Sequence, residues 1–256
     1  MNTLTLRQSL AATALCAALI VTPTSTLLAQ EEAGPILTLY EVQVKHGHDS
    51  KWREGTKAWN KCYADNGGKS AWNAWRRMQG EGNVYVFSVM SDNWADVGER
   101  DPAAKACEEV FETQMTPHEV SEKVMLTQLM TEISNDFVEG TKVVGVYNFT
   151  VEDGRTFEKV ITEVSKAMQK TEGTIPLQWY QSTGGSEDDA DYFVVVNHAD
   201  FASMDKDWTG PWEAAAAQHG EETAEEWRGM FADAVDDQWN YMYAREDDLS
   251  FTPAAE

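Results

Sequence analysis

Two stretches of similar sequence decide the fold: YEVQVKHGHDSKW at Tyr40–Trp52 and YNFTVEDGRTF at Tyr147–Phe157. In each stretch an alternating apolar and polar run leads through a glycine into a segment with helical spacing. The alternation predicts a strand. The glycine, with a capping Asp, Ser or Thr beside it, is typical of a strand-to-helix turn. The chain is therefore predicted to contain the same unit twice.

The similarity continues in the same order along both halves. YVFSVMSDNW at Tyr85–Trp94 matches YFVVVNHADF at Tyr192–Phe201. Near the ends of the halves, Met125–Val138 can be aligned with Met230–Tyr243. Repetition of this kind indicates a duplicated structural unit.

Each half has the same order of predicted elements, which is strand, helix, strand, strand, helical region and strand. In the first half these are Ile36–Lys45, Asp49–Asp65, Ala71–Met78, Asn83–Met90, an interrupted helical region and Ile133–Val138. In the second half they are Val143–Val151, Thr156–Lys170, Ile175–Ser182, Tyr192–His198, an interrupted helical region and Gln238–Arg245. This βαββαβ order is that of a ferredoxin-like unit. The sequence predicts an α+β protein with repeat 1 at residues 36–138 and repeat 2 at residues 142–246.

The two ends of the chain lie outside the repeats. Residues 1–29 carry a single charge at Arg7, followed by an apolar run at Leu10–Val21 that is too short to span a bilayer. This layout is typical of a secretory signal peptide, so we expect a cleaved signal and a periplasmic or secreted protein. Residues 247–256 are expected to form a flexible tail.

The composition limits the classes of partner. The chain of 256 residues is 42% apolar and 25% charged, which is enough for a globular core, and its formal net charge is −23. An acidic surface repels nucleic acid and anionic lipid. No later stretch has the length and apolar character of a membrane span. We expect neither nucleic acid nor a membrane as partner.

The tandem arrangement resembles the dimeric α/β-barrel superfamily, which includes the antibiotic biosynthesis monooxygenases and the EthD-like and NIPSNAP-like proteins. In that superfamily two ferredoxin-like sheets press together into a barrel. The resemblance covers the mature chain and rests on the order of elements. It implies a single-chain barrel, as a monomeric pseudo-dimer or a homodimer, that binds a small molecule. It also suggests cofactor-independent oxygenase or isomerase chemistry, although whether the protein is an enzyme stays open.

The alternation of the first strands predicts which side chains face the barrel interior. Glu41 and Gln43 share a face with apolar residues, and Asn148 lies at the matching position of the second half. In an apolar cavity the Glu41 carboxyl group could act as an acid or a base, with Asn148 and Gln43 binding the ligand. The alternative is a strand-end carboxylate in water. His198, at the end of a predicted strand, is a second candidate acid or base.

Aromatic residues on the second strands are expected to hold an apolar or aromatic ligand. They are Trp75 in the first half and Trp179 and Tyr180 in the second. An aromatic lining with few polar groups is typical of sites for flat apolar molecules. A second hypothesis is a non-enzymatic binding or interaction protein whose barrel is filled by core aromatics.

Haem binding is a third hypothesis. Asn148, Trp208 and His219 resemble, in type and order, the Asn, Trp and His trio of haem-degrading monooxygenases in this superfamily. The resemblance implies His219 as the haem ligand. The alternative is a helix-end histidine that interacts with the helix dipole. The leading hypothesis needs no cofactor.

The pair His46 and His48 is better explained as part of a turn than as a metal site. The second half has Asp153-Gly154-Arg155 at the same place and makes the same predicted turn without histidine. Two histidines would need further ligands from elsewhere, and the sequence contains no HExxH or CxxC motif. No metal site is predicted.

Cys62 and Cys107 align with Ala167 and Ala216 in the other half. Both cysteines lie in helical regions that are neighbours in a ferredoxin-like unit. In an oxidising compartment this favours a helix-to-helix disulfide. The alternative is two buried free thiols, which behave as small apolar residues.

Overall fold

The computed structural model describes residues 34–254 and has an α+β architecture around one closed barrel. Eight antiparallel strands from this part of the chain follow one another around the barrel in the order β1-β3-β2-β8-β5-β7-β6-β4. In chain order the strands are β1 (Ile36–Val44), β2 (Asn73–Arg77), β3 (Asn83–Ser91), β4 (Glu119–Leu129), β5 (Val143–Val151), β6 (Leu177–Gly184), β7 (Tyr192–His198) and β8 (Val235–Arg245). Closure leaves no unpaired sheet edge among them.

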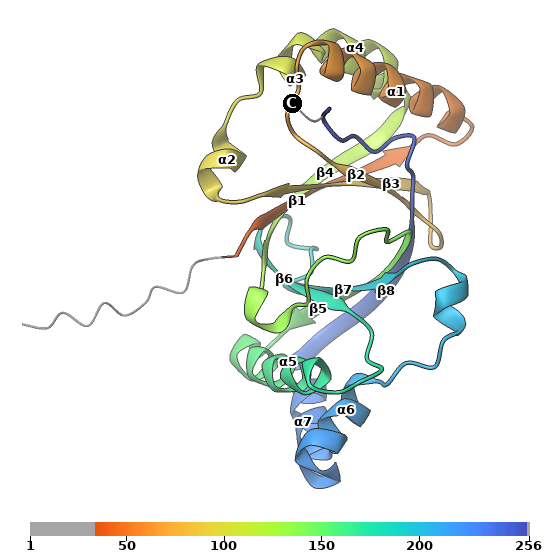
Figure 1. Ribbon diagram of the computed structural model, residues 1–256. Coiled ribbons are helices and arrows are strands. Elements are labelled where there is room, and N and C mark those ends of the chain that lie inside the picture. The colour runs from red at the N-terminus through yellow and green to blue at the C-terminus, as the bar shows by residue number, and fades with distance from the viewer. Residues whose placement is uncertain (1–33, 255–256) are drawn as a thin grey trace, which may run out of the picture. The chain divides into compact units, whose positions relative to one another are not determined.

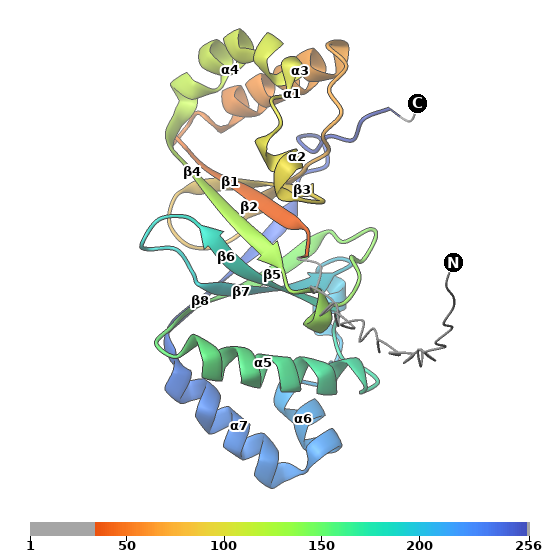
Figure 2. The ribbon, with the colours of Figure 1, turned by 90° about the vertical axis from the view of Figure 1, so that its left-hand side faces the viewer.

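Helices cover the outer face of the barrel on two opposite sides. Figure 1 shows α1, α3 and α4 on one side and α5, α6 and α7 on the other, and Figure 2 shows the same layers from the side. The helices are α1 (Asp49–Asp65), α2 (Trp94–Gly98), α3 (Pro102–Ala106), α4 (Glu108–Gln114), α5 (Gly154–Gln169), α6 (Pro211–His219) and α7 (Glu221–Ala234). Short 3-10 turns are η1 (Thr116–His118), η2 (Thr131–Ile133) and η3 (Ala202–Asp205).

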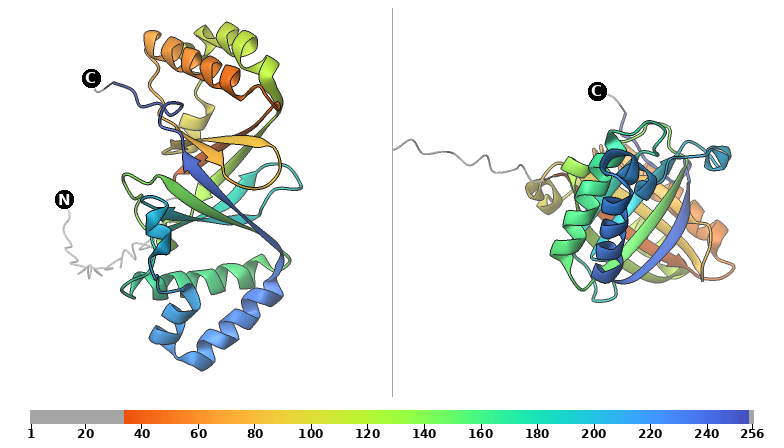
Figure 3. Two further views of the ribbon diagram at one scale, coloured as in Figure 1. Left: turned by 90° about the vertical axis from the view of Figure 1, so that its right-hand side faces the viewer. Right: turned by 90° about the horizontal axis from the view of Figure 1, so that it is seen from below.

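Each half of the chain contributes four neighbouring strands. The first half has the order β4-β1-β3-β2 and the second the order β8-β5-β7-β6. Pairing of β2 with β8 and of β4 with β6 joins the halves into the barrel. Figure 3 shows β8, in blue, running from α7 towards the strands of the first half.

The strand register is the same in both halves. Glu41 pairs with Val86 across β1 and β3, and Asn148 pairs with Phe193 at the equivalent place across β5 and β7. The register between β1 and β4 shifts between Gln43 and Val44. The register between β5 and β8 shifts at the equivalent place, between Thr150 and Val151. A shift of this kind is a β-bulge, which bends a strand and increases its twist. The two halves therefore present matched positions to the barrel interior.

The apolar core lies between each half's helices and the outer face of its strands. Trp52 on α1 and Phe157 on α5 are both fully buried, with 0% of their surface exposed. Trp52 packs against Tyr85, and Phe157 against Trp179 and Tyr192, with ring centroids 4.5 to 6.0 Å apart. Burying such a side chain stabilises the fold by roughly 1.5–3 kcal/mol. The barrel interior is thus left to other residues.

The last strand of the first half was predicted in the wrong place. The sequence predicts it at Ile133–Val138, but the structure has β4 at Glu119–Leu129, and Ile133 is buried in η2. Strands β4 and β8 show the same pattern of burial position by position, so β4 is the counterpart of β8. Glu, Lys, Met, Leu and Gln in β4 favour helix intrinsically, and pairing with β1 and β6 overrides that preference.

The predicted flexible tail also differs from what the structure shows. Leu249 is fully buried, and its carbonyl oxygen accepts hydrogen bonds from Asn60 at 3.0 Å and from the Trp72 indole at 3.1 Å. Phe251 stacks on Trp72 with ring centroids 4.7 Å apart. The segment after β8 therefore packs on the first half, because its two apolar residues fill a gap beside α1 and β2.

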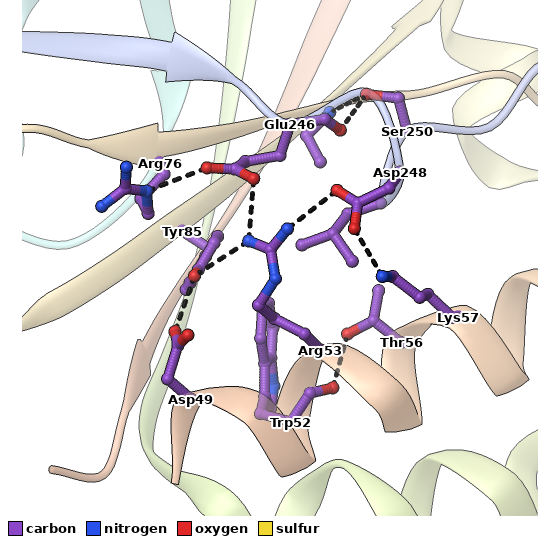
Figure 4. A network of polar contacts seen from close by, with 12 residues as sticks. Asp49, Trp52, Arg53, Thr56, Lys57, Arg76, Tyr85, Glu246, Asp248 and Ser250 are labelled. Carbon is purple, nitrogen blue, oxygen red and sulfur yellow. Dashed lines mark hydrogen bonds and ion pairs between the residues drawn. The ribbon is translucent and has the colours of Figure 1, made fainter. Parts of the chain in front are cut away.

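Ion pairs hold the same segment against α1. Figure 4 shows the Arg53 guanidinium between two carboxylates, those of Glu246 and Asp248, each at 2.8 Å. Arg76 also contacts Glu246 at 2.8 Å, and Lys57 contacts Asp248 at 2.5 Å. These side chains are partly exposed, so each pair contributes about 0–1 kcal/mol. The apolar contacts of Leu249 carry more of the stability.

The predicted disulfide is confirmed. Cys62 on α1 is bonded to Cys107, which lies between α3 and α4, with the Cα atoms 5.9 Å apart. The bond links the two helical regions of the first half across 45 residues of sequence. The aligned positions of the second half hold alanines. A disulfide is typical of proteins in oxidising compartments.

The HGH stretch forms the predicted turn. Gly47 has a φ of +77°, a left-handed conformation that favours glycine. The Nδ1 atom of His48 lies 2.8 Å from Nδ1 of His118, the last residue of η1 before β4. Within residues 34–254, no group of three or more His, Cys, Asp or Glu side chains is placed to hold a metal ion. In the second half Gly154 is instead the first residue of α5 and has no left-handed conformation, and Asp153 accepts a hydrogen bond from the backbone N–H of Thr156 at 3.1 Å.

The predicted signal peptide, residues 1–29, lies outside the described residues. Along residues 34–254, no helix combines the length and the apolar character that crossing a bilayer requires.

Candidate ligand-binding site

The barrel encloses a cavity of about 640 Å³. This volume lies in the range of small-molecule sites, about 300–1,000 Å³. Alternate residues from each of the eight strands contribute to the lining, because successive side chains of a strand point to opposite faces. The inward residues form the cavity, and the outward residues form the core beneath the helices.

The first strand of each half presents its predicted face to the cavity. Leu39 and Glu41 line it from β1, and Val146 and Asn148 line it from β5. Gln43 is not part of the lining. Its amide lies against Gly82 in the hairpin between β2 and β3. The contact is so close that a Cβ atom built on Gly82 would lie only 2.7 Å from Gln43 Nε2. The structure thus places Glu41 and Asn148 in the cavity, while their roles remain predictions.

Two predicted site residues lie on the other face of the sheet. Trp179 packs beneath α5, and its indole nitrogen donates to Ser165 Oγ at 2.9 Å. His198 is half-buried outside the cavity, and burial lowers its pKa. The strand period explains both errors: Tyr180, next to Trp179, and Asn197, next to His198, are the residues that line the cavity.

The charged residues that line the cavity from strands all come from the first half, and Asp188 and Asp189 line it from the loop between β6 and β7. Glu41 on β1 and Lys123 on β4 are cross-strand partners, and Lys123 forms an ion pair with Asp189. Arg77 on β2 lies over the Tyr241 ring, with its guanidinium carbon 4.6 Å from the ring centroid. In residues 34–254, the Glu41 carboxylate has neither a hydrogen-bond donor nor an ion-pair partner. It is therefore available to a ligand.

The second half supplies aromatic and amide groups. Tyr180 stacks on Phe193 with ring centroids 4.9 Å apart, and burial raises the pKa of Tyr180 to about 12. The pKa of Tyr243 is also raised, first by burial and then by the negative charge of Glu41. In the described part of the chain, neither phenol group has a hydrogen-bond partner. Both remain protonated near neutral pH and can donate to an oxygen of a ligand.

A buried amide pair lies in the same lining. Gln178 Nε2 donates to the carbonyl oxygens of Asn135 and Asp136 at 3.2 and 3.1 Å. Asn197 Nδ2 donates in turn to Gln178 Oε1. Gln178 and Asn197 are only 4% and 5% exposed, yet Asn197 Oδ1 has no partner among the described residues. The lining therefore contains an unsatisfied acceptor.

Sequence reasoning missed several lining residues. Lys123 was missed because β4 was not recognised. Arg77 was missed although it lies two residues after Trp75 on β2, so the alternation along that strand could have identified it. The alternation along predicted strands could have identified Asn197 and Tyr243, since each lies an even number of residues from an apolar neighbour that faces inward. The unsatisfied state of Asn197 depends on contacts with the loop after η2 and has no sequence signal.

The trio that suggested haem is not brought together. Asn148 lines the cavity, whereas Trp208 and His219 do not. The Trp208 indole donates to the Ser203 carbonyl oxygen at 3.2 Å, and His219 is exposed at the end of α6 beside Trp227. The cavity lining contains no histidine or cysteine. The residues do not fit a haem held by His219, and no step through haem follows.

Comparisons with known proteins define the fold. No protein-family model matches the sequence, and no curated protein matches it. A candidate monooxygenase from Lactobacillus acidophilus NCFM has a similar structure, with a TM-score of 0.54 and 12% identity over 86% of this chain and 96% of its own. A candidate monooxygenase from Fusobacterium nucleatum subsp. nucleatum gives a TM-score of 0.51 and 12% identity over 87% and 100%.

Chlorite dismutase from Candidatus Nitrospira defluvii, solved in complex with imidazole, is also similar. Its TM-score is 0.53, with 14% identity over 85% of this chain and 93% of its own. At such low identity these likenesses show the fold alone. That fold is α+β with one closed antiparallel barrel, which agrees with the barrel predicted from the order of sequence elements.

Proposed function

We propose that the protein binds a small apolar or aromatic molecule inside the barrel and acts on it as a cofactor-independent monooxygenase or isomerase. The observation that carries this proposal is the cavity of about 640 Å³, with the unpartnered carboxylate of Glu41 beside apolar and aromatic walls. The hypothesis of a barrel filled by core aromatics does not account for this space. The similarity to candidate monooxygenases supports the fold only.

The lining groups suit proton transfer at a carbon next to a carbonyl group. In this chemistry the Glu41 carboxylate accepts a proton from the ligand's C–H bond. The electron pair moves to the carbonyl oxygen, where the hydroxyl of Tyr243 or Tyr180 can donate a hydrogen bond. Return of the proton to another atom completes an isomerisation. Transfer of electrons from the carbanion to dioxygen, as co-substrate, begins an oxygenation.

The finer architecture is also part of the proposal. We infer that the chain consists of two tandem ferredoxin-like repeats, at residues 36–138 and 142–246, as a monomeric pseudo-dimer or a homodimer. Equivalent strand registers, equivalent bulges and the shared burial pattern of β4 and β8 support this inference. We further infer that the protein is periplasmic or secreted after removal of a signal peptide at residues 1–29. The disulfide supports an oxidising compartment.

Neighbouring residues on β5 give a matched test of ligand binding. Val146 lines the cavity, whereas Tyr147 is 46% exposed on the outer face. We expect biphenyl, an apolar aromatic probe, to bind the wild-type protein in isothermal titration calorimetry. Val146→Trp should weaken binding by at least about tenfold, since the indole occupies part of the cavity. Tyr147→Trp should leave it unchanged. Equal binding to both variants, or no binding to the wild type, would refute the proposal.

A further inference from the structure

Lys123 lies between two carboxylates and is paired with one of them. Lys123 on β4 is the direct cross-strand partner of Glu41 on β1, and both residues line the cavity. The Lys123 ammonium group nevertheless forms its ion pair with Asp189, in the loop between β6 and β7. Among residues 34–254, Glu41 has no ion pair of its own. The cation beside the proposed base is therefore held by a loop of the other half.

The strand register allows Lys123 to reach Glu41 as well. Residues directly opposite each other on antiparallel strands have Cβ atoms about 4.5–5.5 Å apart. Glu41 and Lys123 also lie on the same face of the sheet, since both line the cavity. Lysine carries its ammonium group on a flexible four-carbon stem, so it can turn to a carboxylate at this separation. A change of side-chain torsion angles is enough to exchange one carboxylate for the other.

Burial explains why the ion pair forms with Asp189. The Asp189 side chain is only 6% exposed, and its second oxygen accepts a hydrogen bond from the Ser186 backbone N–H at 2.5 Å. A carboxylate that is removed from water is destabilising unless a cation and hydrogen-bond donors satisfy it. Glu41 is only partly buried and borders the cavity, so the same penalty is smaller there. Lys123 therefore stays on Asp189 as long as the loop lies against β4.

The loop that carries Asp189 also covers part of the cavity. Asp188, Asp189 and Ala190 contribute to the lining, and residues 183–188 are exposed. The end of the loop is fixed to the barrel, because the backbone N–H of Asp191 donates to the Phe149 carbonyl oxygen at 2.9 Å. The ion pair with Lys123 joins the loop to β4. Displacement of the loop from β4 would therefore uncover the cavity and release Lys123 together.

We propose that Lys123 couples the position of this loop to the reactivity of Glu41. With the loop against β4, Lys123 binds Asp189, and the Glu41 carboxylate is free to remove a proton from the ligand. When the loop leaves β4, Lys123 pairs with Glu41. The carboxylate then accepts a proton less readily, because an adjacent cation stabilises its charged form. Lys123 and Asp189 are thus positioning residues that act on the reaction through Glu41.

The coupling rests on the proposed function, because it requires that Glu41 be the base. It adds a regulation of that base. The base is active only while the loop covers the cavity, so proton removal is confined to a ligand that is enclosed. An ion pair that only held the loop in place would have no such effect on Glu41.

Two substitutions break the same ion pair but should change the rate in opposite directions. The reaction is the exchange of the acidic C–H protons of 2-tetralone in deuterium oxide, followed by NMR. Asp189→Asn keeps the size of the side chain. The asparagine oxygen accepts the Ser186 N–H, so the NH₂ group faces Lys123 and turns it towards Glu41. We expect kcat to fall about tenfold.

Lys123→Met removes the cation from both carboxylates. Glu41 then has no cation to pair with, so kcat should rise about twofold or more. The exchange is measured over a range of 2-tetralone concentrations, so that a change in affinity is separated from a change in kcat. Lys142→Met is the control, since it breaks an exposed ion pair with Asp247 and should leave kcat unchanged.

The double variant with Asp189→Asn and Lys123→Met gives the decisive comparison. It lacks both members of the ion pair, yet its kcat should return to at least the wild-type value. A crystal structure of the Asp189→Asn variant should show Lys123 Nζ within about 4 Å of a Glu41 carboxylate oxygen. Circular dichroism melting curves check that every variant folds.

The outcomes separate the coupling from the proposed function. If the two single variants and the double variant lose kcat equally, the ion pair only holds the loop and the coupling is wrong. The coupling is also wrong if Lys123 stays away from Glu41 in the crystal structure of the Asp189→Asn variant. If the wild type does not speed the exchange, or Glu41→Gln keeps the wild-type rate, the role proposed for Glu41 fails and the coupling fails with it.

Discussion

The two halves of the barrel share one backbone plan and differ in what they place on it. At equivalent inward positions the first half has Glu41 and Met90, and the second has Asn148 and Asn197. The charged groups that line the cavity from strands come from the first half, and most of the aromatic and amide groups come from the second. The shared backbone plan thus gives a symmetric frame, and the different inward side chains give a cavity with two chemically different sides.

The outer layers diverge as well. The first half carries the disulfide, the histidine pair and the packed C-terminal segment, whereas the helices of the second half share an apolar cluster that includes Val160, Ala215 and Ala224. We therefore expect the halves to differ in stability and in their response to pH and reductant. Each difference can be removed by a substitution.

The largest expected effect concerns the disulfide. Replacing Cys62 and Cys107 by alanine, the residue at the aligned positions of the second half, should lower the free energy of unfolding by about 4 kcal/mol. The crosslink closes 45 residues and restricts the unfolded chain. Urea denaturation measures the change. Reductant should lower the free energy of unfolding of the wild type by a similar amount. It should leave the double variant unaffected, and an effect of reductant on that variant would contradict this explanation.

The C-terminal segment should have the next largest effect. Leu249→Ala should lower the free energy of unfolding by about 3 kcal/mol, because Leu249 is fully buried on the first half. Val120→Ala is the control, since Val120 is 58% exposed on β4 and should change stability by less than about 0.5 kcal/mol. Equal effects of the two substitutions would mean that the segment is not packed.

Glu41 is the charged group at the inward position where the second half has Asn148. If Glu41 removes protons, the protein should speed the exchange of the acidic C–H protons of 2-tetralone in deuterium oxide, followed by NMR. Glu41→Gln should slow this exchange about 100-fold. Glu122→Gln, at an exposed position of β4, should leave the rate unchanged. Exchange that persists in Glu41→Gln would assign the base elsewhere.

The histidine pair should have the smallest effect. Burial, the nearby charges of His48 and two lysines lower the pKa of His118. Folded protein therefore binds this proton less readily than unfolded protein, and stability should fall as the pH drops below the ordinary value near 6.5. His118→Gln should flatten this part of the stability curve between pH 7 and pH 5. Parallel curves for the variant and the wild type would show that the pair does not contribute.

Sequence periodicity was sufficient for the elements with strong alternation or strong amphipathic spacing. The bounds of β5, β7 and α1 agree with the prediction, because β5 and β7 are rich in β-branched and aromatic residues and turn residues bound them. The strand β4 was missed, because its helix-favouring residues are held extended by partners from both halves. Long-range pairing of this kind leaves no local signal.

The site was predictable only in part for the same physical reason. Alternation along a single strand was enough to identify Glu41 and Asn148 and could have identified Arg77 and Asn197 as inward-facing, but it does not show that β2 and β7 line one cavity. Their proximity depends on barrel closure between β2 and β8. The buried C-terminal segment was missed because its two apolar residues, Leu249 and Phe251, are separated by one polar residue and bounded by acids and Pro253.

The central claim is that one cavity inside the barrel binds a small aromatic molecule between a charged side and an amide side. A crystal structure of the protein with biphenyl tests it most directly. We predict the compound inside the barrel, against the rings of Tyr180 and Phe193 and beside Glu41. A barrel interior filled by side chains, or the compound bound only on the outer surface, would contradict the account.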